Sequence, residues 1–298
     1  MTIPSSTIRT TAYLLLLAMT APAARAQTSA LTVEQDGERT LRILDLATGA
    51  LTTIGPIELP PGQFGPTAIT YLPSGELVGV SSSCETLVSI DPETAVTTVI
   101  GDLGADPMPP LSNNVGLAAD ACGRLWMVCG LALYQVDVAT GQAVLRGPLP
   151  VYILGLAAAG GLLYGFDSIA YPDNPHLMSL DPATLDLTTV AEVEGLVAWV
   201  TYSLDIDDAG ELVTLGKVFP PIPIILPQET VHVSLSGEIV SPRVEVLYDG
   251  TVRGLALGPP AGECLGGALP IPTASGSGLA FLAVLIAAAG AILVSRRG

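Results

Sequence analysis

The side chains best suited to binding chemistry lie in irregular stretches between segments that alternate like β-strands. They combine carboxylates, amides, an imidazole and a phenol: Asp106, Asn113, Asn114, Asp167, Tyr171, Asp173, Asn174 and His176. Three further aromatic residues precede short apolar strands and could rim a channel: Tyr152, Trp199 and Tyr202. This mixture suits a glycan, a peptide or a cation, because flat apolar rings stand beside hydrogen-bonding groups. Ordinary loop polarity is the competing interpretation.

Recognisable catalytic and metal-binding motifs are absent from the sequence. His176 and His232 are the only histidines, so neither a three-histidine zinc site nor H-E-x-x-H can form. The stretch 205–211 (D-I-D-D-A-G-E) begins like a calcium loop, but Gly216 stands where an EF-hand requires an acid. A hairpin turn explains it better. We therefore expect no cofactor, with Ca²⁺ as the alternative, and a binding protein in preference to an enzyme.

The composition limits the class of protein. The chain has 298 residues, with 11 basic against 28 acidic side chains and only 13% charged residues. Such an acidic chain lacks the basic surface that nucleic-acid binding requires. With 32 Gly and 25 Pro, a turn-rich β protein is favoured over a helical bundle.

The body of the chain repeats with a period typical of a β-propeller. Four segments of the type L-x-x-x-D-x-x-T-G align, beginning at Leu41, Leu87, Leu133 and Leu177, and a degenerate fifth begins at Val231. Their starts are 46, 46, 44 and 54 residues apart, and periods of 40 to 50 residues indicate propellers. Each segment predicts a hairpin whose Asp and Thr oxygens accept turn N–H groups.

A second series of short apolar strands lies between the hairpins and completes a four-stranded blade. It begins at Thr67, Gly116, Gly155, Ser203 and Gly254. Five blades are predicted, or six if a strand pair lies within 219–244. The last inner strand, 254–258, should join the strands within 31–55 in one mixed blade, which closes the ring and leaves no open edge.

Because successive strands of a blade run in opposite directions, the connections between them are divided between two faces of the propeller, and these faces should differ. Connections between strands 1–2 and 3–4 of each blade are tight turns, whereas the long and varied connections fall on the opposite face. Four of them span 57–65, 102–114, 166–176 and 217–228. Binding sites concentrate in loops held by a rigid scaffold, so the candidate residues above should share this face.

Four cysteines, Cys84, Cys122, Cys129 and Cys264, suggest disulfides in an exported chain. Cys122 and Cys129 flank one extended strand and lie too far apart to pair. Cys84 and Cys129 should lie at the same end of adjacent blades, so we favour that bridge. Cys122 would then pair with Cys264, or Cys264 would be free.

The two ends read as export and anchoring signals. Residues 1–26 resemble a secretory signal peptide, with Arg9, an apolar run, and Ala24 and Ala26 before the expected cleavage site. Residues 279–298 predict a transmembrane helix with a basic tail whose arginines stay cytoplasmic. Between them we place the propeller at 27–265 and a linker with a sorting motif at 266–278.

Two family resemblances follow from these residues. The motif preceding the apolar helix is similar to the IPTL-type sorting signal of Gram-negative bacteria, a relative of PEP-CTERM tails, and matches it at Ile271, Pro272, Thr273, Ser275 and Gly278. Ala274 and Ser277 depart from the usual Leu and Trp. This resemblance implies an exosortase-like membrane protease as a partner. The repeats resemble the D-x-x-T-G propellers of exported bacterial proteins.

These features support three hypotheses. The first is a monomeric, non-catalytic binding or scaffold module, exported across the inner membrane and membrane-anchored, or released to the outer surface after tail processing. It would hold a glycan, peptide or protein on its long-loop face. The second is a metal-dependent propeller enzyme of the lyase or lactonase type, which requires acids and amides from three or more blades to converge at the channel mouth. A structural component of the envelope is the third.

Overall fold

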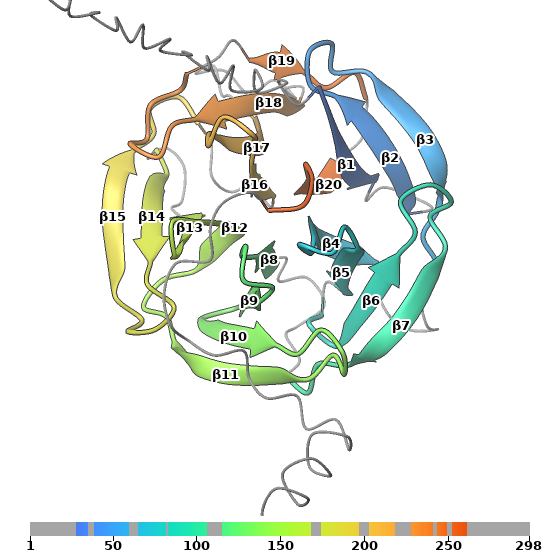
Figure 1. The fold of residues 1–298 in the computed structure, drawn as a ribbon. Coiled ribbons are helices and arrows are strands. Elements are labelled where there is room, and N and C mark those ends of the chain that lie inside the picture. The colour runs from blue at the N-terminus through green and yellow to red at the C-terminus, as the bar shows by residue number, and fades with distance from the viewer. Residues whose placement is uncertain are drawn as a thin grey trace, which may run out of the picture.

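The computed structural model is an all-β propeller of five blades around a central axis (Figure 1). It describes residues 28–34, 39–59, 65–81, 83–105, 115–167, 174–196, 203–217, 228–240, 243–248 and 252–260. The predicted signal peptide, sorting motif and C-terminal helix lie outside these residues. No helix within the described ranges is long and apolar enough to cross a membrane.

Each blade is a four-stranded antiparallel sheet, numbered here from the axis outwards. Blade 1 contains β20 (Val252–Ala256), β1 (Ser29–Glu34), β2 (Thr40–Asp45) and β3 (Leu51–Pro56). Blade 2 contains β4 (Pro66–Tyr71), β5 (Leu77–Ser81), β6 (Thr86–Ile90) and β7 (Thr97–Asp102). Blade 3 contains β8 (Val115–Ala119), β9 (Leu125–Cys129), β10 (Ala132–Val136) and β11 (Ala143–Pro148).

The remaining two blades follow the same order. Blade 4 contains β12 (Ile153–Ala159), β13 (Leu162–Asp167), β14 (His176–Leu180) and β15 (Leu187–Glu192). Blade 5 contains β16 (Leu204–Ile206), β17 (Leu212–Lys217), β18 (Gln228–Val233) and β19 (Val244–Glu245). Because β18 and β19 complete blade 5, the described chain forms five blades and the six-blade alternative is wrong.

The predicted closure of the ring is confirmed. In blade 1, β20 from the end of the propeller pairs with β1 from its beginning, with Thr32 opposite Leu255. The Thr32 hydroxyl adds a 3.2 Å hydrogen bond to the Arg253 carbonyl. Both ends of the domain are thus held in one sheet, which leaves neither of them as an exposed sheet edge.

The repeated Asp and Thr residues cap the outer hairpins as predicted. Asp45 Oδ1 accepts hydrogen bonds from the backbone N–H groups of Ala47 and Thr48, both at 2.9 Å. Asp91, Asp137 and Asp181 accept equivalent bonds in the next three blades. The glycine of the motif is less essential, because Ala95 and Leu185 adopt the same positive φ, at 62° and 65°.

The hydrophobic core consists of five wedges, one between each pair of neighbouring blades. The wedge between blades 2 and 3, for example, contains Val78 and Leu87 from one blade with Leu117 and Met127 from the other. Four similar clusters occupy the remaining interfaces. Since every blade buries both of its faces, no blade has a core of its own and the ring is stabilised as a whole.

The inner strands meet closely at the axis. Their equivalent small residues are Thr67, Gly116, Gly155, Ser203 and Gly254, and the space left at this constriction is about 10 Å³. That is room for about one water molecule. A Cβ on Gly116 would lie 2.7 Å from the carbonyl carbon of Gly155. The axis is therefore narrowed by backbone, which explains the small residues predicted for these strands.

Gly155→Ala should destabilise the propeller by about 3 kcal/mol. Gly155 has φ +65°, and an added Cβ would lie 2.9 Å from Leu204 Cβ, so backbone strain and overpacking add. Gly123→Ala is the matched control, because Gly123 has φ +78° with no atom near an added Cβ and should cost only about 1 kcal/mol. Urea unfolding measures both variants. Equal losses would mean that crowding at the axis is unimportant.

Candidate functional site

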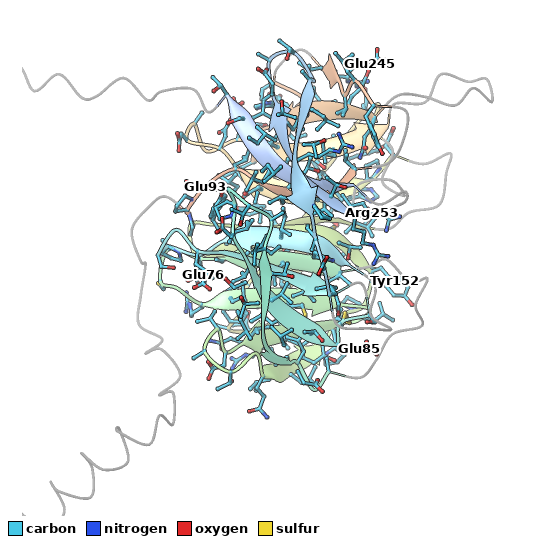
Figure 2. The ribbon with its side chains drawn as sticks, turned by 90° about the vertical axis from the view of Figure 1, so that its right-hand side faces the viewer. Glu76, Glu85, Glu93, Tyr152, Glu245 and Arg253 are labelled. Carbon is cyan, nitrogen blue, oxygen red and sulfur yellow. A yellow bond between two sulfur atoms is a disulfide. The ribbon has the colours of Figure 1, made fainter. Side chains whose placement is uncertain are left out.

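The propeller has two faces that differ in how their strands are connected. We call the face with the 1–2 and 3–4 connections of each blade the turn face, and the face with the 2–3 and 4–1 connections the loop face. In the side view, Glu76 and Glu93 lie on the turn face, and Glu85, Tyr152 and Arg253 lie on the opposite side (Figure 2). All described residues of the predicted binding set belong to the loop face.

The structure brings Asp167 and His176 together on the loop face. Asp167 ends β13, and its Oδ1 accepts a 2.7 Å hydrogen bond from the backbone N–H of His176, the first residue of β14. Its Oδ2 lies 2.9 Å from His176 Nδ1. Asp167 is buried, whereas the His176 side chain is 35% exposed. This pair fixes the base of connection 168–175 and leaves the imidazole accessible to a ligand.

Asn174 links this connection to the next one. Its Nδ2 donates to Glu192 Oε1 at 2.8 Å, and its Oδ1 accepts from the backbone N–H of Gly195 at 3.1 Å. Both partners lie at the end of blade 4, where the chain leaves β15. The amide predicted to contact a ligand therefore holds the two connections of blade 4 together.

Tyr152 precedes β12 and extends into solvent on the loop face, with 41% of its surface exposed. It has the flat, rigid ring that ligand surfaces often use. The other seven predicted residues lie outside the described ranges: Asp106, Asn113, Asn114, Tyr171, Asp173, Trp199 and Tyr202. Their placement stays a prediction.

The predicted disulfide between Cys84 and Cys129 is confirmed, with the two Cα atoms 6.4 Å apart. Cys84 lies in the 2–3 connection of blade 2, and Cys129 ends β9 of blade 3, so the bond joins adjacent blades beside the loop face. No described cysteine is a free thiol. Cys264, the predicted partner of Cys122, lies outside the described ranges.

A cavity of about 230 Å³ opens at the turn-face end of the axis. Alanines of blades 3 and 4 form much of its wall, together with Gly160 of blade 4 and Thr70 of blade 2. The acids in this wall, Asp205, Asp207 and Asp208, all come from blade 5. Within the described residues, acids therefore reach this cavity from a single blade.

Asp205 is the most strongly perturbed carboxyl group of the described chain. The residue is partly buried at the cavity wall, and desolvation raises its pKa from 3.8 to about 7 even though two hydrogen bonds favour the charged form. Those bonds come from the backbone N–H of Leu257 to Oδ2 and of Ile206 to Oδ1, each at 2.8 Å. The bond to Leu257 crosses from blade 5 to the chain that follows β20, so this carboxyl group helps to close the ring.

Gln228 of blade 5 also hydrogen-bonds to blade 1, at the start of β20. Its amide donates to the Val252 carbonyl at 2.9 Å and accepts from the Val252 N–H at 3.0 Å. Gln228 is buried, so this two-way bond satisfies both polar ends of its side chain. Asp205 and Gln228 therefore both have a structural role, because their side chains hydrogen-bond blade 5 to the last segment of the propeller.

Among the described residues, one group could hold a metal ion, and the sequence motifs do not predict it. Asp207, Glu211 and His232 place one ligand atom each within 4.8 Å of one another, and all three are partly buried. Asp207 and Glu211 flank the turn between β16 and β17, and His232 lies on β18. The turn predicted for 205–211 is confirmed by the Gly210 N–H bond to the Asp207 carbonyl.

Comparisons with known proteins add a likeness of fold only. No protein-family model and no curated protein matches the chain. Among solved structures, a chain of a nidogen/laminin complex is 11% identical, with a TM-score of 0.49, over 76% of this chain and 97% of that one. TolB from Acinetobacter baumannii is 13% identical, with a TM-score of 0.46, over 78% and 67%. Kuenenia stuttgartiensis hydrazine synthase is 15% identical, with a TM-score of 0.42, over 63% and 51%.

Proposed function

We propose that the chain is an exported β-propeller that acts as a non-catalytic binding module through its loop face. The observation that carries this proposal is the difference between the two faces. Turn-face connections such as 45–50, 91–96 and 137–142 repeat one compact, Asp-capped geometry. Most of the long connections lie on the loop face, where variation does not disturb the blades: 57–65, 103–114, 168–175, 193–203 and 218–227. Two connections depart from this rule, the two-residue 2–3 connection of blade 3 (130–131) and the ten-residue 3–4 connection of blade 5 (234–243) on the turn face.

The described part of the loop face is rigid enough to present a binding surface. The Cys84–Cys129 disulfide joins blades 2 and 3 beside it. In blade 4, Asp167 holds His176, and Asn174 bonds to the chain that leaves β15. A surface fixed in this way loses little conformational entropy when a ligand binds. Tyr152 adds an exposed ring, and we expect a glycan, a peptide or a protein as the ligand.

The enzyme hypothesis receives less support from the described residues. It requires acids and amides from at least three blades to converge at the channel mouth. At the turn-face end of the channel, the acids in the described cavity wall come from blade 5 alone. We therefore retain the binding module as the principal proposal.

Export and surface sorting complete the proposed function. The Cys84–Cys129 disulfide supports an oxidising compartment, because such bonds persist mainly outside the cytosol. The signal peptide would direct the chain across the inner membrane. The C-terminal helix would then anchor it until an exosortase-like protease processes the tail.

Tyr152→Ala should weaken ligand binding by at least tenfold, because truncating a tyrosine at the centre of an interface typically costs about 2 kcal/mol. The purified chain is first applied to glycan and peptide arrays, and the dissociation constant of the strongest ligand is then measured for both forms. Leu235→Ala is the control, since Leu235 is 36% exposed in a turn-face hairpin. Loss of binding in the control alone, or no ligand on either array, would contradict the proposal.

A further inference from the structure

Two blades of the propeller use the same turn between their first and second strands in different ways. In blade 3, Asp120 donates its N–H to the Arg124 carbonyl at 3.0 Å and accepts from Gly123 N–H at 2.9 Å. In blade 5, Asp207 makes the equivalent bonds with Glu211 and Gly210 at the same distances. The two turns therefore have the same hydrogen bonds at equivalent positions, so that Asp207 corresponds to Asp120 and Glu211 to Arg124.

The first carboxylate oxygen of each aspartate has the same structural role. Asp120 Oδ1 accepts from the backbone N–H groups of Cys122 and Arg124, at 2.9 and 3.0 Å. Asp207 Oδ1 accepts from those of Ala209 and Glu211, both at 2.9 Å. Capping of the turn accounts for one oxygen in each blade and leaves the other, Oδ2, for a different partner.

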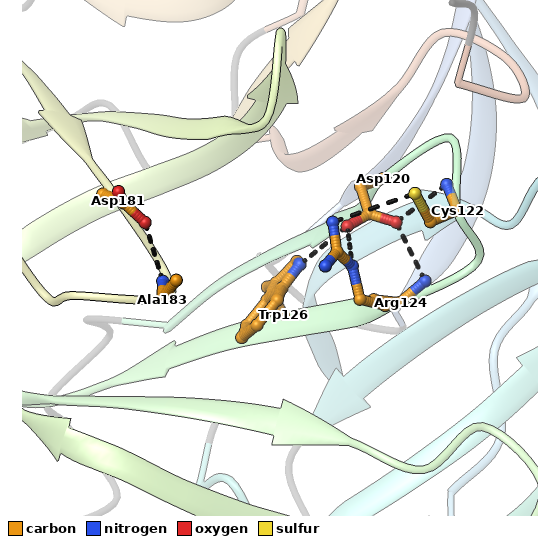
Figure 3. A network of polar contacts seen from close by, with 6 residues as sticks. All are labelled: Asp120, Cys122, Arg124, Trp126, Asp181 and Ala183. Atoms are coloured by element: carbon orange, nitrogen blue, oxygen red, sulfur yellow. Dashed lines mark hydrogen bonds and ion pairs between the residues drawn. The ribbon is translucent and has the colours of Figure 1, made fainter. Parts of the chain in front are cut away.

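In blade 3 the second oxygen, Asp120 Oδ2, accepts hydrogen bonds from a cationic side chain and from an indole. Asp120 Oδ2 accepts from Arg124 Nε at 2.6 Å and from the indole N–H of Trp126 at 3.1 Å (Figure 3). The Arg124 guanidinium also lies over the Trp126 ring. This turn is therefore a closed network that contains its own positive charge.

In blade 5 both of those donors are replaced. Glu211 stands in the position of Arg124, and Val213 stands in the position of Trp126. His232, which pairs across the sheet with Val213, supplies a nitrogen instead. Its Nδ1 lies 3.4 Å from Asp207 Oδ2 and 3.5 Å from Glu211 Oε2. Two carboxylates thus face one imidazole, where the related blade has one carboxylate and one arginine.

From this arrangement we propose that Asp207, Glu211 and His232 bind a zinc-type divalent ion in blade 5. Zn²⁺ bound at about 2.0–2.1 Å in tetrahedral geometry holds its ligand atoms about 3.4 Å apart, which agrees with the 3.4 and 3.5 Å separations. The imidazole favours such an ion over Ca²⁺, which takes six to eight oxygen ligands. The ion would supply the positive charge that Arg124 provides in blade 3.

The site is accessible and lies at the edge of the turn-face cavity. The side chains of Asp207, His232 and Glu211 are 11%, 19% and 35% exposed, so an ion can enter from solvent. Asp207 also forms part of the cavity wall. Three protein ligands leave the fourth position of a tetrahedral ion for water or a small anion.

The test measures zinc binding to the purified, metal-free full chain by competition with a chromophoric chelator. We expect one Zn²⁺ per chain, no competition by excess Ca²⁺, and the visible absorption of four-coordinate Co²⁺ when cobalt replaces zinc. His232→Gln and Glu211→Gln should each weaken binding by more than about 100-fold, because loss of a direct ligand exceeds the usual effect of changing its supporting residues.

His176→Gln is the matched control, because it removes the other histidine, which also lies beside a carboxylate, and should leave zinc binding unchanged. Glu211→Gln alters the most exposed of the three side chains and keeps the test valid if His232→Gln fails to fold. Binding of less than one zinc per chain, equal binding in His232→Gln, or stronger binding of Ca²⁺ would overturn the proposal. Hydrogen bonding between the His232 imidazole and the two carboxylates would then explain the geometry.

Discussion

Replacing Cys84 and Cys129 together by alanine should lower the free energy of unfolding by about 4 kcal/mol. The disulfide closes a loop across a sequence separation of 45 residues, and loop-closure entropy in the unfolded chain predicts an effect of this size. The closed loop runs from blade 2 to the second strand of blade 3. Urea unfolding of the oxidised wild type and of the double variant measures the difference.

Two controls separate this effect from simple loss of packing. Both cysteines are buried, so the single variants Cys84→Ala and Cys129→Ala lose the disulfide with only one of the two sulfur atoms. If loop closure dominates, the single and double variants should be similarly unstable. Variants that remain as stable as the oxidised wild type would contradict a stabilising role for this bond.

Raising the pH from about 4 to above 7 should lower the contribution of Asp205 to stability by up to about 4 kcal/mol. Burial raises the pKa of this carboxyl group to about 7 in the folded chain, whereas it returns to its ordinary value on unfolding. Below about pH 4 the group is protonated in both states, and its stabilising effect is fully present. Between pH 4 and 7 only the folded state keeps the proton, so stability falls as the pH rises through the folded pKa.

Asp205→Asn isolates this effect, because asparagine cannot titrate. It loses one of the two hydrogen bonds that Asp205 accepts from Ile206 and Leu257, but that cost does not depend on pH. Urea unfolding of both forms at several pH values, with EDTA present, gives the difference between wild type and variant. The wild-type advantage should decline between pH 4 and 7. A difference that is constant across this range would show that Asp205 titrates normally.

The fold was largely predictable because its determinants are local and repeated. The aspartates at 45, 91, 137 and 181 specify similar hairpins through bonds to their own turns. The closure of the ring followed from counting strands at both ends of the body, and β20 does pair with β1. The Cys84–Cys129 bridge followed in turn from the predicted register of neighbouring blades.

The site was less predictable because its contacts depend on pairing between distant strands. His232 lies in the degenerate fifth repeat, which lacks the aspartate that identifies the others. Only the pairing of β17 with β18 places it opposite Val213 and beside Asp207 and Glu211. Asn174 illustrates the same difficulty, since its bond to Gly195 joins two connections whose paths no local pattern specifies.

The measurement that tests the binding proposal most directly is hydrogen exchange of the chain with and without its array-selected ligand. Ligand binding should protect loop-face segments, including 149–153, 174–176 and 193–196. Exchange in the Asp-capped turns at 45–50, 91–96 and 137–142 should stay unchanged. Protection confined to those turns, with no change on the loop face, would contradict the proposal that the variable connections form the binding surface.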